Sequence, residues 1–566
     1  MKYLLLLLIT TINVLARAQS PSDIRIYYNG IIYTATSAVT TVEAVAIRRD
    51  KIIAVGKLSD VKKSTGDKSV LVDLEGACMM PGLIDSHNHA ISGGRSLLVA
   101  NLGDTLLSAG QLSAYAAKVI ASRRGLRGDV LCIQGMHSAT WNDVPSLDKI
   151  FNNPDFGRGV FLRGSDGHTA WVNSILLRRA GINADFIHTL PPAEQHYFGL
   201  TNGVPNGLLS EDGIQYVSDI IPASAIGSLD ALVAGTKHLN SLGITAWMDP
   251  AAGSTDEGSN NESLVTYNKA VSENKLTAHV TTVIVANAND EPAAQIDVVK
   301  QWQKRMATGP VSVVGFKIFS DGVMEYPTQT ASMVAPYKNS GQNGSQMVDP
   351  GKFKLFLVAA DRAKLLVHVH AIGDRAVTET LDAIEAARKV NGNMTIPHSI
   401  THLQCVQPSD LARFKALNVL ASMQLLWATA DSYTEDLVKP YISATAYEYM
   451  YPARSILNHG GVICGASDWP VSNANPFDAI AIAETRKGAN GILNAGERLS
   501  RPDMLQAYTI HAARAILRDK EIGSLEVGKQ ADLIVLDRDV LTVSSESIRD
   551  TKVVWTMVNG KVVFQR

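Results

Sequence analysis

The sequence predicts an α/β protein: a (β/α)8 TIM barrel, a small β-sandwich domain from both chain ends, and an insertion after the first barrel strand. Three observations support this fold. Apolar strand-like runs alternate with helical stretches through the centre of the chain, which is typical of a parallel sheet with crossover helices. Short β-rich segments lie at both ends. Polar residues that can bind metal ions close several central runs, and barrel active sites lie at that end of the strands.

The first 18 residues have the pattern of a secretory signal peptide. Lys2 supplies a positive charge, an apolar stretch follows, and Ala16-Arg17-Ala18 forms a small-x-small cleavage site, which predicts cleavage before Gln19. The apolar stretch is too short for a robust membrane-spanning helix, and an uncleaved anchor is the alternative. We therefore expect an exported protein, secreted or periplasmic, that has no membrane contact after signal cleavage.

Both ends of the mature chain contain short strand-like runs. These runs are residues 24–34, 44–55 and 70–74 near the start, and 531–536 and 552–563 near the end. Asn29-Gly30 and Asn559-Gly560 are typical of tight hairpin turns. We expect residues 19–80 and 516–566 to form one β domain, on either side of a hydrolase barrel at 81–515.

The central region contains more strand-like runs than a barrel needs. The runs are residues 82–87, 130–134, 160–163, 243–248, 279–286, 313–319, 365–370, 399–403, 419–423 and 461–465. Because a (β/α)8 barrel uses only eight strands, some runs must belong to an insertion. Residues from about 95 to 240 are the predicted insertion, since they separate the first metal-binding motif from the next clean barrel-type strand.

Composition argues against several classes of function. The 566 residues are 46% hydrophobic and 19% charged, which is ordinary for a globular protein with a large core. The formal net charge is −2 and no long basic run occurs, so nucleic-acid binding has no electrostatic support. The four cysteines form no CxxC pair, and we expect buried free thiols rather than a disulfide framework.

Two pairs of histidines close apolar runs. His87 and His89 are two residues apart, so a strand directs both imidazoles to the same side, as a shared metal ion requires. This pattern alone is weak, because two histidines often coincide by chance. His368 and His370 repeat it. We expect His370 to lie nearest the strand end and His368 one layer deeper, although the pattern leaves the choice of ligand between them open.

A third strand-like run carries His402. A polar histidine in an apolar strand must be paired, bound to a metal ion, or neutral and hydrogen-bonded. His398 is the competing candidate, but it lies just before the strand. Asp468 follows the last apolar run, where its carboxylate can bind a metal ion or take a proton from a bound water. The alternative for Asp468 is an Asx-turn or helix cap before Pro470.

Lys317 lies inside the apolar run 313–319. Burying a charged ammonium is costly, so this side chain must be paired, neutral or chemically modified. A lowered pKa would allow the amine to add carbon dioxide, which gives a carbamate that can bridge two metal ions. The alternative is a lysine that extends out of the strand into water.

The order of these signals along the chain resembles the amidohydrolase superfamily, in its amidohydrolase-3 or YtcJ-like branch. The resemblance covers almost the whole mature chain. It rests on the motifs PGLIDSHNH (81–89), RGSDGHTAWVNS (163–174), GVPNGLLSEDG (203–213), FKIFSDG (316–322), TASMVAPY (330–337), HAIGDRA (370–376), ITHLQ (400–404), ASDWPV (466–471) and GSLEVGKQADLIVLD (523–537).

This resemblance implies a zinc site with two divalent ions per chain. His87 and His89 are then ligands of the more buried ion, and His370 and His402 are ligands of the second. Lys317 resembles the carbamylated lysine that bridges the two ions, although a single-ion site is the alternative. Asp468 resembles the metal-binding aspartate of the eighth strand, which orients and deprotonates the hydrolytic water.

The insertion carries a further motif of the branch. Arg163, Asp166, His168 and Asn173 resemble substrate-side residues, and His168 is a candidate catalytic contact to the oxyanion or leaving group. A structural histidine in a glycine-rich turn is the alternative for His168. Trp141, Asp321 and Arg375 are further candidates for substrate binding or for a supporting role.

We therefore expect a metal-dependent hydrolase that cleaves an amide-type, non-peptide C–N bond of a small molecule by a metal-activated hydroxide. N-substituted formamides and other N-acyl compounds are the first substrates that the resemblance suggests. The alternatives are an ester or lactone hydrolase with the same site, an isomerase or hydratase on the same scaffold, and a noncatalytic metal-binding barrel. The oligomeric state stays open, with a homodimer as one option.

Overall fold

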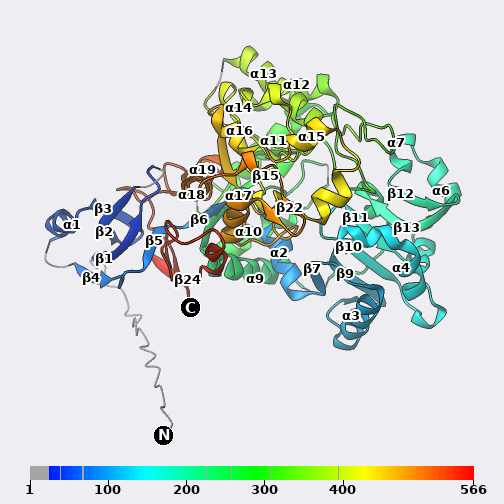
Figure 1. The fold of residues 1–566 in the computed structure, drawn as a ribbon, viewed down its shortest axis with the longest axis horizontal. Helices are drawn as coiled ribbons and strands as arrows, with labels where there is room; N and C mark the ends of the chain where they lie inside the picture. The colour runs from blue at the N-terminus through cyan, green and yellow to red at the C-terminus, as the bar shows by residue number, and fades with distance from the viewer. Residues whose placement is uncertain are drawn as a thin grey trace, which may run out of the picture.

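The computed structural model describes residues 24–37, 40–66, 69–224, 226–256, 258–307, 309–392 and 394–566, with no side chain described for residue 193. The predicted signal peptide, residues 1–18, lies outside this part of the chain. Figure 1 shows three regions in a row: a sheet from the chain termini at one end, a central barrel, and an inserted α/β region at the other end. No helix within the described residues is both long enough and apolar enough to cross a membrane.

The central barrel consists of eight parallel strands. In spatial order they are β6 (Leu83–Asp85), β14 (Ile244–Asp249), β15 (His279–Val285), β16 (Val311–Phe319), β17 (Leu366–Ala371), β18 (Ser399–His402), β19 (Leu420–Met423) and β20 (Val462–Gly465). The N–H of Ser86 donates to the carbonyl of Gly465 at 2.9 Å, which joins the two edges of this sheet. The predicted (β/α)8 barrel is confirmed, and each of these strands overlaps a run that the sequence predicts.

The barrel strands are buried on both faces, which explains their continuous apolar runs. Every residue of β14 and of β17 is buried. The helices between and after these strands in the chain are α2 (Ala90–Leu98), α9 (Ser228–Ser241), α10 (Glu262–Ser272), α11 (Pro292–Arg305), α12 (Pro350–Arg362), α13 (Asp374–Asn391), α14 (Arg413–Ala416), α15 (Ala444–Glu448), α16 (Ala453–Asn458), α17 (Pro476–Thr485), α18 (Arg501–Ala507) and α19 (Ile510–Ala515). Polar side chains inside these strands therefore need partners within the protein.

Both ends of the chain meet in one eight-stranded sheet, as the strand-like runs predict. The predicted hairpin turn at Asn29-Gly30 is wrong, because both residues lie inside the single strand Ile24–Tyr33, where its pairing register shifts. Its order is β25 (Lys561–Gln565), β24 (Val553–Val558), β23 (Leu533–Leu536), β5 (Cys78–Pro81), β1 (Ile24–Tyr33), β2 (Thr41–Arg48) and β3 (Lys51–Gly56), with β4 (Val70–Asp73) beside β1 and the helix α1 (Leu58–Thr65) nearby. Val45, Met79 and Leu533 share one buried cluster, so residues from both ends form a common core.

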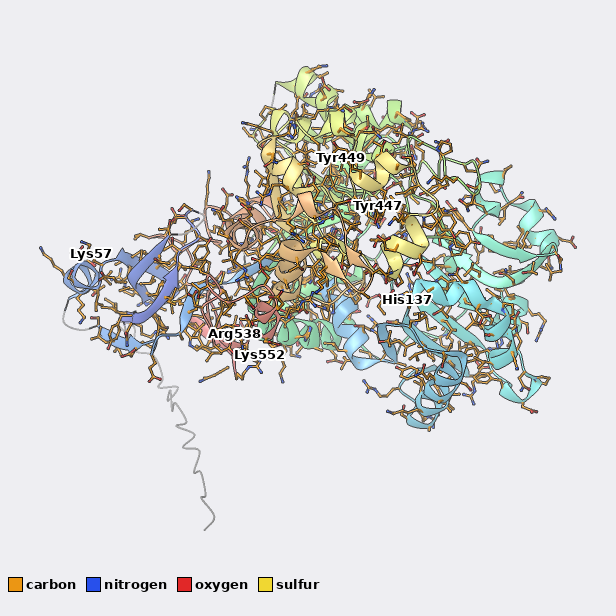
Figure 2. All side chains as sticks on the ribbon, viewed as in Figure 1. Lys57, His137, Tyr447, Tyr449, Arg538 and Lys552 are labelled. Carbon is orange, nitrogen blue, oxygen red and sulfur yellow. The ribbon has the colours of Figure 1, made fainter. Side chains whose placement is uncertain are left out.

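A third sheet lies between α2 and α9 in sequence, at the predicted insertion. Its order is β12 (Phe198–Thr201), β13 (Val204–Ser210), β11 (Thr169–Val172), β10 (Val160–Gly164), β9 (Val130–Met136) and β7 (Asn101–Thr105), with β8 (Leu126–Arg127) beside β9. The helices of this region are α3 (Ala109–Ser122), α4 (Val144–Phe151), α5 (Ser174–Arg179), α6 (Ala184–Thr189), α7 (Pro192–Gln195) and α8 (Gln215–Ser218). The surplus strands 130–134 and 160–163 belong here. Figure 2 shows His137 where this region meets the barrel, and Lys57 at the far end of the molecule.

Candidate metal centre and active site

His87 and His89 lie at the mouth of the barrel, directly after β6. Both imidazoles face Asp468, with their Nε2 atoms 3.3 and 3.2 Å from the same carboxylate oxygen, Oδ1. The His87 side chain is buried, whereas that of His89 is 27% exposed. His87 uses its other ring nitrogen, Nδ1, to contact Nε2 of His368 at 2.7 Å. The Nε2 atoms of His87 and His89 are thus directed toward the same carboxylate oxygen of Asp468.

Asp468 lies on the loop that follows β20 and faces both of these imidazoles. Its backbone φ of 56° is in the left-handed region, and its N–H donates to the carbonyl of His87 at 2.8 Å. Burial opposes ionisation of this carboxyl, but His89, His402 and Lys317 together lower its pKa below the ordinary value. The carboxylate is therefore ionised at neutral pH, as a metal ligand or a general base requires.

Asp85 links the segment that carries His87 to the segment that carries Asp468. Its buried carboxylate accepts from the N–H of Ser467 at 3.0 Å, from the Ser467 hydroxyl at 2.5 Å and from the amide of Asn88 at 2.9 Å. Burial raises the pKa of Asp85 to about 6. This residue connects the segment after β6 to the segment after β20, and so fixes the distance between His87 and Asp468.

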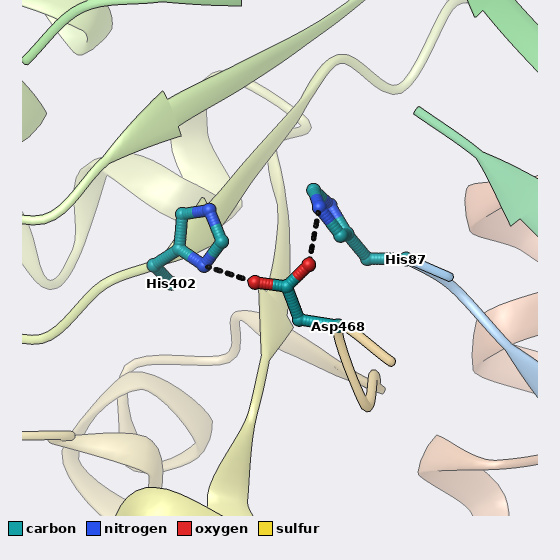
Figure 3. Close-up of side chains that lie close together, drawn as sticks. All are labelled: His87, His402 and Asp468. Carbon is teal, nitrogen blue, oxygen red and sulfur yellow. Dashed lines mark ion pairs between the residues drawn. The ribbon is translucent and has the colours of Figure 1, made fainter. Parts of the chain in front are cut away.

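His402 completes a cluster with these residues at the end of β18. Its Nδ1 lies 3.9 Å from Oδ2 of Asp468 and 3.1 Å from Oε1 of Gln424. Its ring stacks on Trp427, with the ring centroids 5.7 Å apart. Ligand atoms of His87, His402 and Asp468 all lie within 4.8 Å of one another, and Figure 3 shows the carboxylate of Asp468 between the two imidazoles.

The structure places His368 and His370 at different depths. Both ring nitrogens of His368 have partners, since Nε2 contacts His87 and Nδ1 lies 2.6 Å from the hydroxyl of Ser399. His370 lies at the barrel mouth, where its ring centroid is 4.4 Å from that of His402. Its Nε2 contacts the carbonyl of Gly322 at 3.1 Å. Because a carbonyl only accepts, Nε2 carries the proton, and Nδ1 is the nitrogen with a lone pair for a metal ion.

Lys317 is fully enclosed on β16, close to these histidines. Burial lowers its pKa to about 7, and its Nζ lies 4.9 Å from the centre of the Phe319 ring. Burial, and next the charge of Lys317, lower the pKa values of His87, His368 and His370 well below the ordinary value. These imidazoles are therefore neutral. Neutral imidazoles, an ionised carboxylate and a lysine amine that loses its charge near neutral pH form a donor set that fits zinc-type divalent ions.

His168 approaches this cluster from the inserted region. Its ring centroid lies 5.6 Å from that of His370, and its Nδ1 lies 2.8 Å from Oε2 of Glu211. Burial opposes the charged imidazolium, but the Glu211 carboxylate outweighs it and raises the pKa of His168 to about 8. The structure thus brings His168 to the metal-ligand candidates, although it is remote from them in sequence.

The other predicted substrate-side residues have partners within the protein. Arg163 donates to the carbonyl of Gly167 at 2.9 Å, and Trp141 donates from its indole to the hydroxyl of Thr169 at 2.8 Å. Asp166 accepts from the N–H groups of His168 and Thr169, each at 2.9 Å. These contacts build the turn that carries His168. A direct contact of any of them with substrate stays a prediction.

Asp321 lies behind His370 rather than at the open face of the site. Its carboxylate is fully buried and accepts from the N–H groups of Ser332, Ile372 and Gly373 at 2.8–3.0 Å. One of its oxygens lies 3.6 Å from Nε2 of His370. Burial raises the pKa of Asp321 to about 7. Its contact with substrate stays a prediction. Its observed contacts instead place it against His370, a candidate metal ligand.

Sequence reasoning missed three residues of this site: Glu211, Gln424 and Asp85. Gln424 and Asp85 could have been found by the rule that polar residues at barrel strand ends line the site, because they lie at the ends of β19 and β6. Glu211 had a weaker signal. It lies within the motif at 203–213, but nothing in the spacing connects it to His168, 43 residues earlier.

Comparisons with known proteins agree with this geometry. The model of the amidohydrolase family matches residues 70–564. Over most of both chains, the protein is 31% identical to Protein LONG AFTER FAR-RED 3 of Arabidopsis thaliana (95% of this chain and 91% of the relative) and 26% identical to the putative amidohydrolase YtcJ of Bacillus subtilis (96% and 99%).

Two further matches concern a named reaction and the fold. The chain is 22% identical to an N-substituted formamide deformylase of Arthrobacter pascens, over 95% of this chain and 98% of the relative. An uncharacterized metal-dependent hydrolase of Pyrococcus horikoshii superposes with a TM-score of 0.68 at 22% identity, over 92% of this chain and 99% of the other. The fold is thus shared along nearly the whole chain. The chain belongs to the amidohydrolase family.

Proposed function

We propose that this protein is a metal-dependent hydrolase that cleaves an amide-type, non-peptide C–N bond of a small molecule. The observation that carries the proposal is the buried cluster of His87, His402 and Asp468 at the carboxyl ends of the barrel strands. A structural core has no need to place neutral imidazoles around an ionised carboxylate, because each buried polar group costs free energy unless it is paired.

We infer a zinc site with two divalent ions. His87 and His89 would hold the deeper ion, since their Nε2 atoms converge beside Asp468. His370 and His402 would hold the second ion. Lys317 lies among them with a pKa of about 7, which favours the neutral amine that reacts with carbon dioxide, and its carbamate would bridge the ions. When bound, such ions supply a nucleophilic hydroxide at neutral pH and polarise the substrate carbonyl.

The protein's own residues then supply proton transfer. Asp468 is ionised and lies between the imidazoles, so its carboxylate can accept a proton from the attacking water and pass it to the leaving nitrogen. Asp85 and the N–H contact to His87 hold this carboxylate in place. His168 is favoured as the imidazolium, so its Nε2 can donate to the substrate oxygen as negative charge develops on it.

The amide class is preferred over the alternatives for a chemical reason. An amine leaving group needs a proton, and Asp468 together with His168 provides two groups that can deliver one. The relative named as an N-substituted formamide deformylase agrees with this preference, so N-substituted formamides are the first class to test. An ester or lactone would use the same groups but has less need of a proton donor.

The test is product analysis with the zinc-loaded protein and matched formamide, N-acyl, ester and lactone substrates in water enriched in ¹⁸O. Hydrolysis of the amides, with one labelled oxygen in the acid product, supports the proposal. Turnover of esters or lactones alone would replace the substrate class. Rearranged product without the label would identify an isomerase, and no turnover of any class would favour a noncatalytic barrel.

A further inference from the structure

The contacts of Glu211 suggest a role for this residue that goes beyond a salt bridge. Its two carboxylate oxygens serve two different segments. Oε2 lies 2.8 Å from Nδ1 of His168, and Oε1 accepts from the hydroxyl of Thr330 at 2.9 Å. His168 belongs to the inserted sheet region, whereas Thr330 belongs to the loop after barrel strand β16. One side chain therefore joins the insertion to the barrel at the mouth of the site.

A second contact fixes Glu211 against His168. The N–H of Glu211 donates to the carbonyl of His168 at 3.0 Å, so backbone and side chain hold the histidine at two points. Glu211 adopts a φ of 45°, in the left-handed region that costs free energy for a residue other than glycine. The rest of the fold must offset this cost. The strained backbone turns the carboxylate of Glu211 toward His168.

The contacts on the barrel side continue to a metal-ligand candidate. The hydroxyl of Thr330 accepts from the N–H of Val323 at 3.0 Å, and the neighbouring Gly322 carbonyl contacts Nε2 of His370 at 3.1 Å. A side chain at Gly322 has no room, since its Cβ would lie 2.1 Å from the Thr330 hydroxyl and 2.7 Å from Oε1 of Glu211. The position of Glu211 is thus linked by direct contacts to that of His370.

The second ring nitrogen of His168, Nε2, faces the site. Its side chain is 22% exposed, and its ring lies against that of His370. Among the described residues, no hydrogen-bond partner is found for its Nε2. A histidine whose Nδ1 is held by a carboxylate has a fixed ring orientation and presents Nε2 to its surroundings.

We propose that Glu211 is a positioning residue: it holds His168 by Nδ1 and ties it to the barrel loop through Thr330, so that Nε2 of His168 meets the substrate beside His370. This inference rests on the proposed function. It assigns the inserted region a part in the reaction itself, because the segment that contacts substrate is locked to the barrel rather than free to move relative to it.

Two conservative variants separate the length of the side chain from its charge. Glu211→Gln keeps the length, and its amide oxygen can still accept from His168. Glu211→Asp keeps the charge but is one methylene shorter, and it cannot reach His168 and Thr330 together. Positioning predicts that Glu211→Asp and Glu211→Ala lower kcat about as much as His168→Ala, by roughly 100-fold or more, with a smaller change in KM. Glu211→Gln should lower kcat less than Glu211→Ala does, because it keeps the contact that orients His168 but loses the negative charge that favours the imidazolium.

The double variant Glu211→Ala/His168→Ala should be no slower than His168→Ala, because both changes remove one unit. The matched control is Glu448→Ala, which removes an exposed carboxylate on α15 and should behave as wild type. Full kcat in Glu211→Asp, or losses that multiply in the double variant, would overturn the proposal.

A readout without turnover completes the test. In protein labelled with ¹⁵N-histidine, the signal that disappears in His168→Ala should show a hydrogen-bonded Nδ1–H in the wild type and in Glu211→Gln. It should show a mixture of tautomers in Glu211→Asp and Glu211→Ala. An unchanged signal in Glu211→Ala would overturn the proposal. If the zinc-loaded protein hydrolyses none of the substrates, the proposed function fails, while these spectra still decide the role of Glu211.

Discussion

Nδ1 of His87 lies 2.7 Å from Nε2 of His368, and the hydroxyl of Ser399 lies 2.6 Å from the other nitrogen of His368. This chain of contacts leaves Nε2 of His87 directed toward Asp468. Partners of this kind fix the tautomer and the ring orientation of a metal-binding histidine. We therefore propose that His368 orients the candidate ligand His87 rather than binding the metal ion itself.

The first prediction concerns this support. His368→Ala should weaken zinc binding by roughly 10- to 100-fold, because His87 remains but loses the contact that orients it. Competition with a chromophoric chelator measures the affinity. The matched control is His459→Ala, which removes an exposed histidine that follows α16 and whose Nδ1 contacts the carbonyl of Ser455 in that helix. Equal zinc affinity in His368→Ala and wild type would contradict the supporting role.

The second prediction separates the base from the ligands. Asp468→Asn should keep zinc but lower kcat by roughly 100- to 10,000-fold, since the amide cannot accept the proton of the attacking water. His87→Ala should instead lose metal. Metal analysis and steady-state kinetics on the same samples check both. Full turnover in Asp468→Asn would remove Asp468 from the mechanism, and unchanged metal in His87→Ala would remove His87 from the ligands.

The third prediction concerns Lys317. Burial lowers its pKa to about 7, so the amine is mostly neutral above that pH and can add carbon dioxide. Metal-free protein should regain more zinc and more activity with zinc and bicarbonate together than with zinc alone, and the advantage should grow as the pH rises through about 7. Lys317→Arg, which cannot form the carbamate, should show no bicarbonate effect. A bicarbonate effect of the same size in Lys317→Arg would contradict the role of Lys317.

The fourth prediction concerns Asp321. Removing its carboxylate leaves three buried N–H groups, those of Ser332, Ile372 and Gly373, without their acceptor. At about 1–3 kcal/mol for each group, Asp321→Ala should lower the free energy of unfolding by roughly 3 kcal/mol or more. Urea unfolding measures the change, with the exposed Asp297→Ala as control. A stable Asp321→Ala variant with a raised KM would instead favour the substrate-binding role.

The fifth prediction is a pH dependence of stability in the metal-free protein. Glu211 raises the pKa of His168 from 6.5 to about 8, despite burial. A raised pKa in the folded state stabilises the fold below the unfolded value, and this contribution disappears as the pH rises through about 8. The unfolding free energy of wild type minus that of His168→Asn should therefore fall by about 2 kcal/mol between pH ~6 and pH ~9. A pH-independent difference would contradict the ion pair.

Much of the fold follows from local sequence, because apolar runs of strand length are a direct consequence of burial on both faces. All eight barrel strands overlap predicted runs, from Leu83–Asp85 to Val462–Gly465. The two surplus runs pair in the inserted sheet instead, where β9 and β10 are neighbours. Periodicity alone cannot assign a strand to one sheet or another, since that depends on contacts between distant segments.

Some residues of the site could likewise be predicted from local sequence, and others required the structure. Ligand candidates at strand ends could be predicted, because the carboxyl ends of parallel strands meet at one face of the barrel. Glu211 could not, since its significance comes from a turn with a φ of 45° and from contacts to residues on two other segments. The depth of His368 relative to His370 was predicted from their places on one strand, but their partners required the structure.

The central claim is that the cluster around Asp468 is a metal centre used for hydrolysis, and metal analysis of protein purified without chelator tests it most directly. About two zinc-type ions per chain in the wild type, retained in Asp468→Asn together with loss of amide hydrolysis, is the predicted result. No bound metal, with none taken up when zinc and bicarbonate are added, would contradict it.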